Sequence, residues 1–365
     1  MTSPRSQIVA LDVRLAGREG TGDSTYWLGL LHGLSEIESG LSFLLFSNVE
    51  KPREIPESDN FRWMTLPSGS SRFWSLARFP LAARRAGAHA IHTQYNLSPL
   101  AGRVGITTIH DVSFFIGPEW FKPRDLWLLR RFVPASAKRA ARVITVSETS
   151  RQDIERYVPA VRGKISVTSL ARSPLIKPVE HGLAKQAAQR LGLDGPFLLT
   201  VGTRWPRKNM DLAVQAVEGL SDRFPHRLAI TGKPGWGEES LGRRGFATGY
   251  LSASDLSALY SAADLYLAPS RHEGFGIPLL EAFACGCPVV CSSGGALPEV
   301  AGDAALVLKS WEPADWTGAV SNLLESRSKL DDLRARGRIR EPQFTWTQTA
   351  QKTIEVYQNV IRNRS

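Results

Sequence analysis

The sequence has few cysteines and no long apolar run. Three of its 365 residues are cysteine, too few for a disulfide framework, so a reducing compartment is expected. No apolar run approaches the roughly 18 to 20 residues of a membrane-spanning helix. Residues 1–6 are not followed by the apolar stretch of a signal peptide. These absences exclude an integral membrane protein and a disulfide-rich secreted scaffold, and they predict a cytoplasmic location.

Two common nucleotide-site patterns are also missing. The sequence has no Asp-x-Asp pair, the usual carboxylate pair of a metal-held sugar nucleotide, so no metal is expected. Gly17, Gly20 and Gly22 do not give the Gly-x-Gly-x-x-Gly spacing of a dinucleotide-binding turn, which ranks a dinucleotide-dependent oxidoreductase low. The three cysteines of residues 285–291 have no fourth metal ligand nearby and are expected to pack.

Acidic residues are outnumbered mainly in the first half of the chain. Residues 1–172 contain 23 Lys and Arg against 15 Asp and Glu, whereas residues 173–365 contain 22 against 20, and the net charge is +10. A basic half could meet nucleic acid, an anionic membrane or a phosphorylated substrate. Charge alone leaves open a basic nucleic-acid- or membrane-binding protein, or simply a solvated arginine-rich surface.

Short β-branched and apolar runs alternate with helical patterns along the chain. Many of the runs are apolar on both faces, as in buried parallel strands, and such βα alternation predicts doubly wound α/β sheets. The predicted strands are residues 8–15, 41–47, 62–66, 88–94, 105–111, 141–147, 164–170, 197–203, 227–233, 248–251, 264–270, 288–293 and 304–309. The predicted helices are residues 24–38, 72–86, 123–139, 148–158, 209–224, 254–262, 277–285 and 313–325.

The chain is too long for one ordinary core, so two domains are expected. A polar stretch with two prolines, residues 171–178, marks the boundary. The predicted domains are residues 1–172 and 173–343, two Rossmann-like domains that face a cleft. Residues 344–365 are the remaining segment, which opens with Phe-Thr-Trp and continues as an amphipathic helical pattern to Ile361.

The strongest local motif is residues 269–282, Pro-Ser-Arg-His-Glu-Gly-Phe-Gly-Ile-Pro-Leu-Leu-Glu-Ala. It follows an apolar strand, and its glycines, Gly274 and Gly276, permit unusual backbone angles and close approach of a ligand. A helix that begins after Gly276 would offer free N–H groups to an anion. Glu281 would lie in its first turn, able to accept hydrogen bonds from hydroxyls, and Glu273 would stand on the loop before it. The alternative is an ordinary turn followed by a capped helix.

A second motif joins a strand to a helix and gathers three cations within five positions. It spans residues 201–210, begins with Val-Gly and carries Arg204, Arg207 and Lys208. Guanidinium and ammonium groups beside a helix N-terminus could neutralise a diphosphate leaving group. Alone, this segment could equally be a solvated basic loop.

Together, several segments resemble glycosyltransferase family 4 in order along the chain. Glu273 and Glu281 form the E-x7-E pattern that is the family's best-known mark. The matching segments are residues 199–209, 232–237, 249–251, 255–260, 269–288 and 297–302, with looser matches at 108–113 and 146–151. The resemblance implies the GT-B fold, with residues 344–365 as a crossover helix that packs back on the first domain. It also implies sugar transfer from a nucleotide diphosphate donor with retention of configuration.

The resemblance also implies roles for individual residues. Glu281 would bind the donor ribose. Glu273 and the backbone of the loop 274–276 would contact the donor sugar, and Lys208 with an arginine would hold the diphosphate. His110 would face the donor sugar from the first domain. The donor-side residues implied are Gly202, Arg204, Arg207, Lys208, Tyr250, Leu251, Glu273, Gly274, Phe275, Gly276 and Glu281.

The sequence departs from the family pattern in two places. Many relatives carry an arginine directly after the glycine of the second motif, where this chain has Thr203, so Arg204 or Arg207 must replace it. Relatives also often carry a Gly-Gly-x-Gly loop after the first strand, for which Gly20 and Gly22 are the expected acceptor-side substitutes.

The implied setting is assembly of a bacterial cell-surface polysaccharide. GDP-mannose is the predicted donor, with UDP- and dTDP-sugars as alternatives, and the acceptor is a saccharide or lipid-linked saccharide. The basic segment 122–142, which mixes Trp127 and Phe132 with arginines, is predicted either to lie on an anionic membrane or to pack on its own domain. A peripheral position at the inner membrane face follows from the first alternative.

Overall fold

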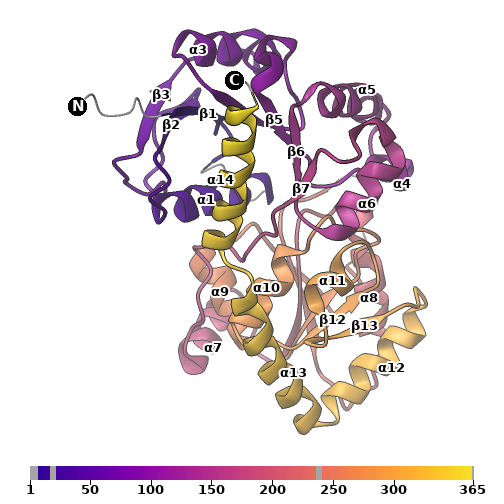
Figure 1. Ribbon diagram of the computed structural model, residues 1–365. Helices are drawn as coiled ribbons and strands as arrows, with labels where there is room; N and C mark the ends of the chain where they lie inside the picture. The colour runs from indigo at the N-terminus through magenta and orange to yellow at the C-terminus, as the bar shows by residue number, and fades with distance from the viewer. Residues whose placement is uncertain (1–6, 17–21, 236–240, 364–365) are drawn as a thin grey trace. The chain divides into compact units, whose positions relative to one another are not determined.

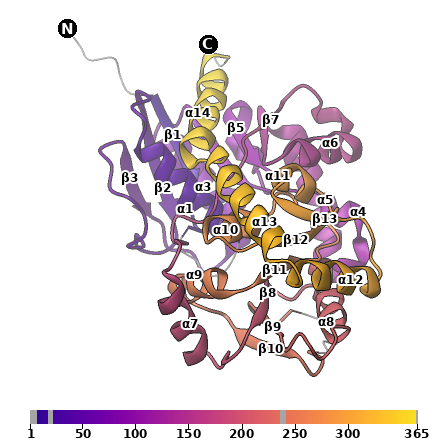
Figure 2. The ribbon, with the colours of Figure 1, turned by 90° about the horizontal axis from the view of Figure 1, so that it is seen from below.

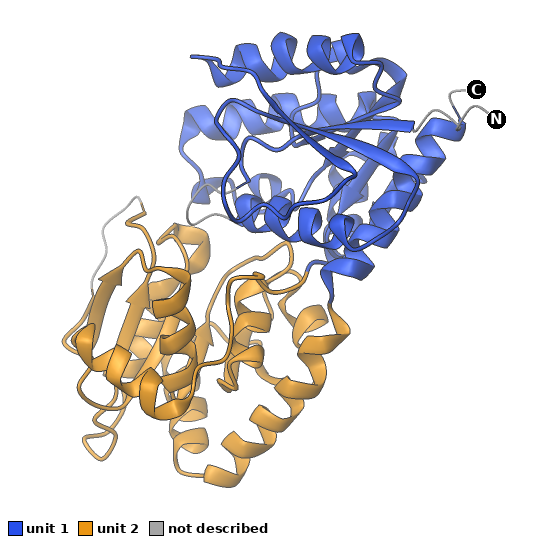
Figure 3. Cartoon of the chain, turned by 90° about the vertical axis from the view of Figure 1, so that its left-hand side faces the viewer, with its two compact units in different colours: residues 1–170, 345–365 blue, residues 171–344 orange. Residues whose placement is uncertain are grey.

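The structure, a computed structural model, describes residues 7–16, 22–235 and 241–363. The chain divides into two compact units (Figure 3): unit 1 contains residues 1–170 and 345–365, and unit 2 contains residues 171–344. The sequence placed these boundaries after residues 172 and 343. Each unit is built around one parallel sheet.

The described part of unit 1 contains a seven-stranded sheet. Its strands are β1 (Gln7–Asp12), β2 (Leu41–Ser47), β3 (Phe61–Thr65), β4 (Ala90–Gln94), β5 (Gly105–Thr108), β6 (Arg142–Thr145) and β7 (Ile165–Val167). The spatial order is β3-β2-β1-β4-β5-β6-β7, with every pairing parallel. The order reverses between β1 and β4, the point at which doubly wound sheets bind ligands beyond the carboxyl ends of their strands.

Helices connect the strands of unit 1. They are α1 (Gly22–Ser35), α2 (Ser71–Phe73), the π-helical turn η1 (Trp74–Arg78), α3 (Phe79–Arg85), η2 (Pro99–Val104), α4 (Ser113–Ile116), η3 (Pro118–Trp120), α5 (Pro123–Arg139), α6 (Glu148–Tyr157), η4 (Pro159–Val161) and α14 (Trp346–Arg362). The helix predicted at 72–86 is thus interrupted by a π turn.

Helix α14 lies against α1 within unit 1, as Figure 1 shows. Glycines make this close approach possible. A Cβ atom on Gly29 would lie 1.9 Å from Cε2 of Trp346, and one on Gly33 would lie 2.2 Å from the carbonyl oxygen of Trp346. The C-terminal helix therefore packs on α1 of unit 1, although the chain has passed through unit 2 before reaching it.

The sheet of unit 2 has six strands within the described residues. They are β8 (Phe197–Val201), β9 (Arg227–Thr231), β10 (Gly245–Gly249), β11 (Leu265–Ala268), β12 (Val289–Ser292) and β13 (Ala305–Leu308). Their parallel order is β10-β9-β8-β11-β12-β13, which reverses between β8 and β11. The loops that follow β8 and β11 therefore flank the switch point of this sheet.

Helices also surround the sheet of unit 2. They are α7 (His181–Arg190), η5 (Pro206–Lys208), α8 (Met210–Glu218), α9 (Ala253–Ala262), α10 (Ile277–Ala284), α11 (Leu297–Ala301), α12 (Pro313–Leu324), α13 (Arg327–Arg340) and η6 (Glu341–Gln343). Figure 2 shows α13 beside α10, where a Cβ on Gly337 would lie 2.9 Å from Cδ1 of Phe283. Leu212, Trp316 and Leu333 bring α8, α12 and α13 into one apolar core.

The structure differs from the predicted local structure in five places. Helices α7 and α13 were not predicted, and β10 occupies 245–249 rather than 248–251. Helix α8 ends at Glu218, not 224, because Gly219 caps it and packs against Thr317. The strand predicted at 8–15 stops at Asp12, where the chain turns.

Candidate functional site

The two loops at the switch point of unit 2 are joined to each other. The backbone N–H of Arg271 donates to the carbonyl of Arg207 at 2.8 Å, and the Asn209 side chain donates to the carbonyl of Pro269 at 3.3 Å. Asn209 holds a left-handed φ of 50°, which lets the loop after β8 turn sharply into α8. The second sequence motif therefore lies beside the first.

Two cationic side chains of the loop after β8 form ion pairs with one carboxylate of the loop after β11. Arg207 Nη1 lies 2.9 Å from Oε2 of Glu273, and Lys208 Nζ lies 2.7 Å from Oε1. The three side chains expose only 12 to 17% of their surface. Burial alone would raise the pKa of Glu273, but the positive charges of Arg207 and Lys208 hold it well below its usual range. The cluster is thus an ionised carboxylate between two cations, with a net charge of +1.

Glycines leave room for Lys208 and for the neighbouring loop after β9. Gly202 has a φ of 139°, and a Cβ there would lie 3.1 Å from Cε of Lys208. A Cβ on Gly232 would lie 2.1 Å from the carbonyl oxygen of Gly202. Arg204 lies on the same loop, where its backbone N–H donates to the carbonyl of Lys233 at 3.1 Å. The structure brings Arg207 and Lys208 together on one carboxylate, that of Glu273.

Glu281 lies in α10, which begins at Ile277 after the glycine loop, so it is the fifth residue of the helix and not in the first turn as predicted. It is 7% exposed, and the Tyr260 hydroxyl donates to its Oε2 at 3.2 Å. Burial raises the pKa of Glu281 to about 7, although Tyr260 and the backbone N–H of Ser173 lower it. The carboxyl group of Glu281 therefore titrates near neutral pH, whereas the lowered pKa of Glu273 keeps that group ionised. Tyr260 and Ser173 were not predicted as partners of Glu281.

In the loop 274–276, between Glu273 and Glu281, the backbone is the part that could contact a ligand. Gly276 caps α10 with a φ of 109°, a conformation that favours glycine, and a Cβ there would lie 2.8 Å from a methyl carbon of Leu297. Phe275 is buried, and its ring packs against Phe344 at 5.7 Å between centroids. The side chain of Phe275 is thus engaged in packing. Gly274 is also buried. At the start of α10, Pro278 has no N–H and the N–H of Leu279 donates to the carbonyl of Gly276 at 3.0 Å, so a backbone contact to an anion there would use the N–H groups of Gly276 and Ile277.

Tyr250 and Leu251 follow β10 at the same edge of the sheet. Leu251 is buried, whereas Tyr250 is 45% exposed and its ring lies 5.0 Å from Nζ of Lys233. A flat, exposed aromatic ring of this kind offers a stacking surface.

No metal-binding group of three or more His, Cys, Asp or Glu side chains occurs in the described ranges. Cysteines 285, 287 and 291 are buried, and burial raises the pKa of all three thiols.

His110 lies in unit 1, just after β5. Its Nε2 is 2.9 Å from the side-chain nitrogen of Gln94 and 3.5 Å from a carboxylate oxygen of Asp23, and the Tyr26 ring meets it edge-on at 4.9 Å. Burial lowers the pKa of His110, although the charges of Asp23 and Asp111 oppose this shift, and the lowered pKa favours the neutral ring. Gln94 was not predicted, yet it ends β4, which pairs with β5, so strand order could have revealed it.

Next to His110 a buried chain of polar contacts joins four elements of unit 1, namely β4, β5, α1 and α14. His92 on β4 contacts the hydroxyls of Tyr357 and Thr108 at 2.7 Å each, and Tyr26 on α1 contacts Thr108 at 2.9 Å. Burial lowers the pKa of His92 to about 3, so its ring remains neutral. These contacts connect α14 and α1 to β4 and β5, and β5 ends two residues before His110.

The acceptor-side glycines are only partly described. Gly22 is the exposed first residue of α1, whereas Gly20 lies outside the described residues.

Among the described helices, none combines the length and the apolar character that a transmembrane span requires.

Comparison with known proteins identifies the chain. Residues 184–340 match the profile described as glycosyl transferases group 1, and residues 37–170 match that of glycosyltransferase family 4. Over 267 residues the chain is 34% identical to the O-antigen chain mannosyltransferase B of Escherichia coli, covering 69% of each protein. The chain belongs to glycosyltransferase family 4. This membership decides against an oxidoreductase.

Two further comparisons give the extent of the likeness. The chain is 26% identical over 244 residues to the serotype-specific mannosyltransferase WbdA of Escherichia coli, but it matches only 30% of that longer protein. The sucrose-phosphate synthase of Thermosynechococcus elongatus superposes with a TM-score of 0.75 at 22% identity, over 98% of this chain and all of that one. The predicted GT-B fold, two Rossmann-like units with a C-terminal helix that returns to the first, is thereby confirmed.

Proposed function

We propose that this glycosyltransferase moves a mannose-type hexose from a nucleotide diphosphate sugar to a saccharide or lipid-linked saccharide, with retention of configuration. The observation that carries the donor assignment is the Arg207–Lys208–Glu273 cluster at the switch point of unit 2. Its net positive charge, beside the start of α10, suits a diphosphate. The likeness to the O-antigen mannosyltransferase supports mannose and a cell-surface polysaccharide.

The residues of the proposed site divide the tasks of donor binding among them. Lys208 and Arg207 neutralise the diphosphate, the N–H groups of α10 and the loop backbone hold its oxygens and the sugar, and Glu281 accepts hydrogen bonds from the ribose hydroxyls. Glu273 holds the two cations in place and contacts the donor sugar. Tyr250 and Leu251 lie beside the base, and neutral His110 hydrogen-bonds a sugar hydroxyl.

The proposed reaction keeps attack and departure on one face of the sugar. The bond between C1 and the phosphate oxygen breaks while the acceptor oxygen bonds to C1. The acceptor proton passes to the departing phosphate oxygen, so no protein base is needed. The negative charge that grows on the diphosphate is stabilised by the fixed cations, which therefore act most strongly in the transition state.

A thermal-shift panel tests the donor assignment. GDP-mannose, UDP-glucose, dTDP-glucose and ADP-glucose are added separately, and we expect GDP-mannose to raise the melting temperature most. A ligand at 100 times its dissociation constant stabilises the folded protein by about 2.7 kcal/mol. A larger shift with another nucleotide would reassign the donor, and no shift with any of them would reject the site.

Replacing Glu281 tests the ribose contact. We expect Glu281→Ala to weaken donor binding by about 2 to 3 kcal/mol, because a charge-assisted pair of hydrogen bonds is lost. Since the pKa of Glu281 is raised to about 7 and the ribose hydroxyls bind its ionised form, donor affinity should rise between pH 6 and 8. Calorimetric titration at both values checks this. A pH dependence that Glu281→Gln leaves unchanged would contradict it.

Transfer should survive chelation. The absent Asp-x-Asp pair and the available cations Arg207 and Lys208 predict that EDTA leaves the transfer rate unchanged. The measurement is sugar transfer with and without EDTA, followed by addition of magnesium or manganese. Activity abolished by EDTA and restored by either metal would refute the prediction.

A further inference from the structure

Exposed apolar side chains concentrate on three elements of unit 1. Eight large apolar side chains are exposed in its described part, and six of them lie on the helical segment 71–85, on η2 and on α5. These six are Phe73, Leu76, Leu81, Leu100, Trp127 and Phe132. Phe73, Leu76 and Trp127 expose 57%, 53% and 63% of their surface. Scattered single apolar residues are ordinary, but such a concentration indicates an interaction surface.

The three elements lie on the same side of the sheet. The segments between β3 and β4, β4 and β5, and β5 and β6 all move in one direction along the strand order, so right-handed crossovers place them on one face. Hydrogen bonds also join them. Ser98, before η2, donates to the carbonyl of Leu76 at 2.6 Å, and Arg139 on α5 donates to the carbonyl of Leu97 at 2.7 Å.

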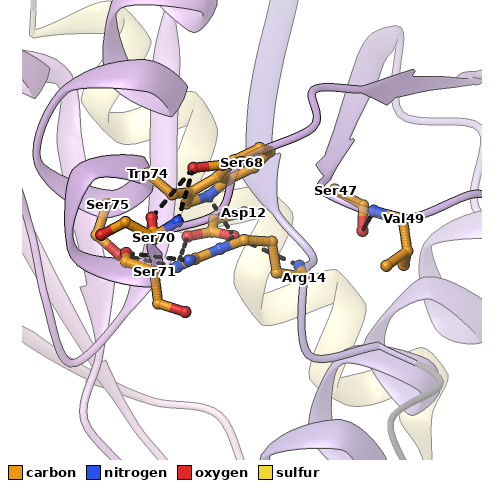
Figure 4. A network of polar contacts seen from close by, with 9 residues as sticks. All are labelled: Asp12, Arg14, Ser47, Val49, Ser68, Ser70, Ser71, Trp74 and Ser75. Atoms are coloured by element: carbon orange, nitrogen blue, oxygen red, sulfur yellow. Dashed lines mark hydrogen bonds and ion pairs between the residues drawn. The ribbon is translucent and has the colours of Figure 1, made fainter.

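The inner side of the segment 71–85 is fixed to the end of β1 (Figure 4). Arg14 donates to both oxygens of Asp12 at 2.8 Å and to the Ser75 hydroxyl at 2.8 Å, and the Trp74 indole donates to Asp12 at 3.2 Å. Trp74 is fully buried. Because this side is held in the unit, Phe73 on the same turn is held facing outward.

The π turn keeps the apolar side chains on one stripe. The backbone N–H of Phe79 donates to the carbonyl of Trp74, five residues earlier, which inserts one residue into the helix. Phe73 and Leu81 are eight positions apart, which after the insertion is close to two turns. Arg84 and Arg85 follow Leu81 by three and four positions and so extend the stripe.

The charge around these side chains is predominantly positive. Residues 60–110 contain six arginines and no Asp or Glu, and α5 contains four arginines and one lysine against the single acid Asp125. Arg72, Arg78 and Arg85 are exposed. An anionic partner is therefore favoured, and apolar side chains among cations are the pattern of helices that lie in a bilayer interface.

We propose that the basic apolar face, defined as the exposed residues of the segment 71–85, η2 and α5, docks on an anionic lipid bilayer. It extends the membrane prediction made for 122–142 alone to two elements that the sequence did not indicate. Nucleic acid would use the arginines but would leave the aliphatic Leu76, Leu81 and Leu100 without a role. The proposal rests on the proposed function only in making a lipid-linked acceptor the substrate that docking would serve.

Co-sedimentation with vesicles of phosphatidylglycerol and phosphatidylcholine, against phosphatidylcholine alone, tests the proposal. We expect the full chain to pellet with the anionic vesicles. Phe73→Ser/Leu76→Ser should lower the partition coefficient about tenfold, through lost apolar burial. Arg84→Glu/Arg85→Glu should lower it by roughly 25-fold or more, at about fivefold for each lost cation.

Matched controls lie on unit 2. Ile339→Ser removes an apolar side chain that is 71% exposed, and Lys185→Glu/Arg190→Glu makes the same charge change on α7. Both should pellet like the wild type. The proposal is overturned if the wild type does not pellet, if face and control variants pellet equally, or if an oligonucleotide displaces the vesicles. Because sedimentation needs no sugar transfer, a failed donor assignment would leave this result intact.

Discussion

Replacing Lys208 with alanine should lower kcat by about two to three orders of magnitude, the usual effect of removing a fixed electrostatic group. Lys208 is held beside Gly202 and 2.7 Å from Glu273, so its charge is already in place before the reaction begins. The charge on the proposed diphosphate increases as it leaves. The ammonium group therefore stabilises the transition state more than the bound donor.

Steady-state kinetics of Lys208→Ala and Lys208→Met distinguish stabilisation of the transition state by Lys208 from a role in donor binding. A fall in kcat is expected in both, since neither carries a charge. A rise in KM alone would mean that the cation contributes uniform binding instead. Arg207→Ala and Arg204→Ala, measured in parallel, distinguish the two arginines. The contact of Arg207 with Glu273 predicts the larger loss for Arg207.

Most of the fold could be predicted from the sequence because buried parallel strands have a recognisable apolar pattern. Runs such as Phe197–Val201 and Leu265–Ala268 are apolar on both faces, and both were located. Helix α13 was missed because only Leu330, Leu333 and Gly337 of its fourteen residues are buried. Helix α7 was missed for a similar reason, since its buried residues are all alanine. A weak apolar stripe gives no periodic signal.

The site could be predicted only as a set of residues. The motifs located Glu273, Glu281, Arg207 and Lys208. Nothing in their spacing indicated that both cations would form ion pairs with Glu273. That pairing spans 65 and 66 positions and depends on β8 and β11 being neighbours in the sheet. The opposite pKa shifts of the two acids likewise come from burial and partners, which a single sequence does not display.

The basic apolar face shows the same limit. The sequence indicated the segment 122–142, where aromatic residues and arginines stand close together. It did not indicate Phe73 and Leu76, because the same stretch also contains the buried Trp74 and Phe79. Only the fold separates the buried side of that helix from its exposed side.

Replacing Glu273 with glutamine should lower the free energy of unfolding by about 3 kcal/mol at pH 7. The substitution keeps the shape but leaves Arg207 and Lys208, both largely buried, without a counter-charge. Removing one partner of a buried ion pair costs about 3 to 5 kcal/mol, and the remaining exposure and the amide oxygen place this case at the lower end. Urea unfolding measures the difference.

The pH dependence distinguishes charge from packing in this variant. The pKa of Glu273 is lowered in the folded protein, so its contribution is fully present above its ordinary value of 4.5 and is lost as the pH falls below it. The deficit of Glu273→Gln should therefore be about 1 kcal/mol smaller at pH 3.5 than at pH 7. The exposed Glu312 offers a matched control, and Glu312→Gln should change stability by less than about 0.5 kcal/mol. A deficit in Glu273→Gln that is equal at both pH values would show that the carboxylate acts through its shape and not through its charge.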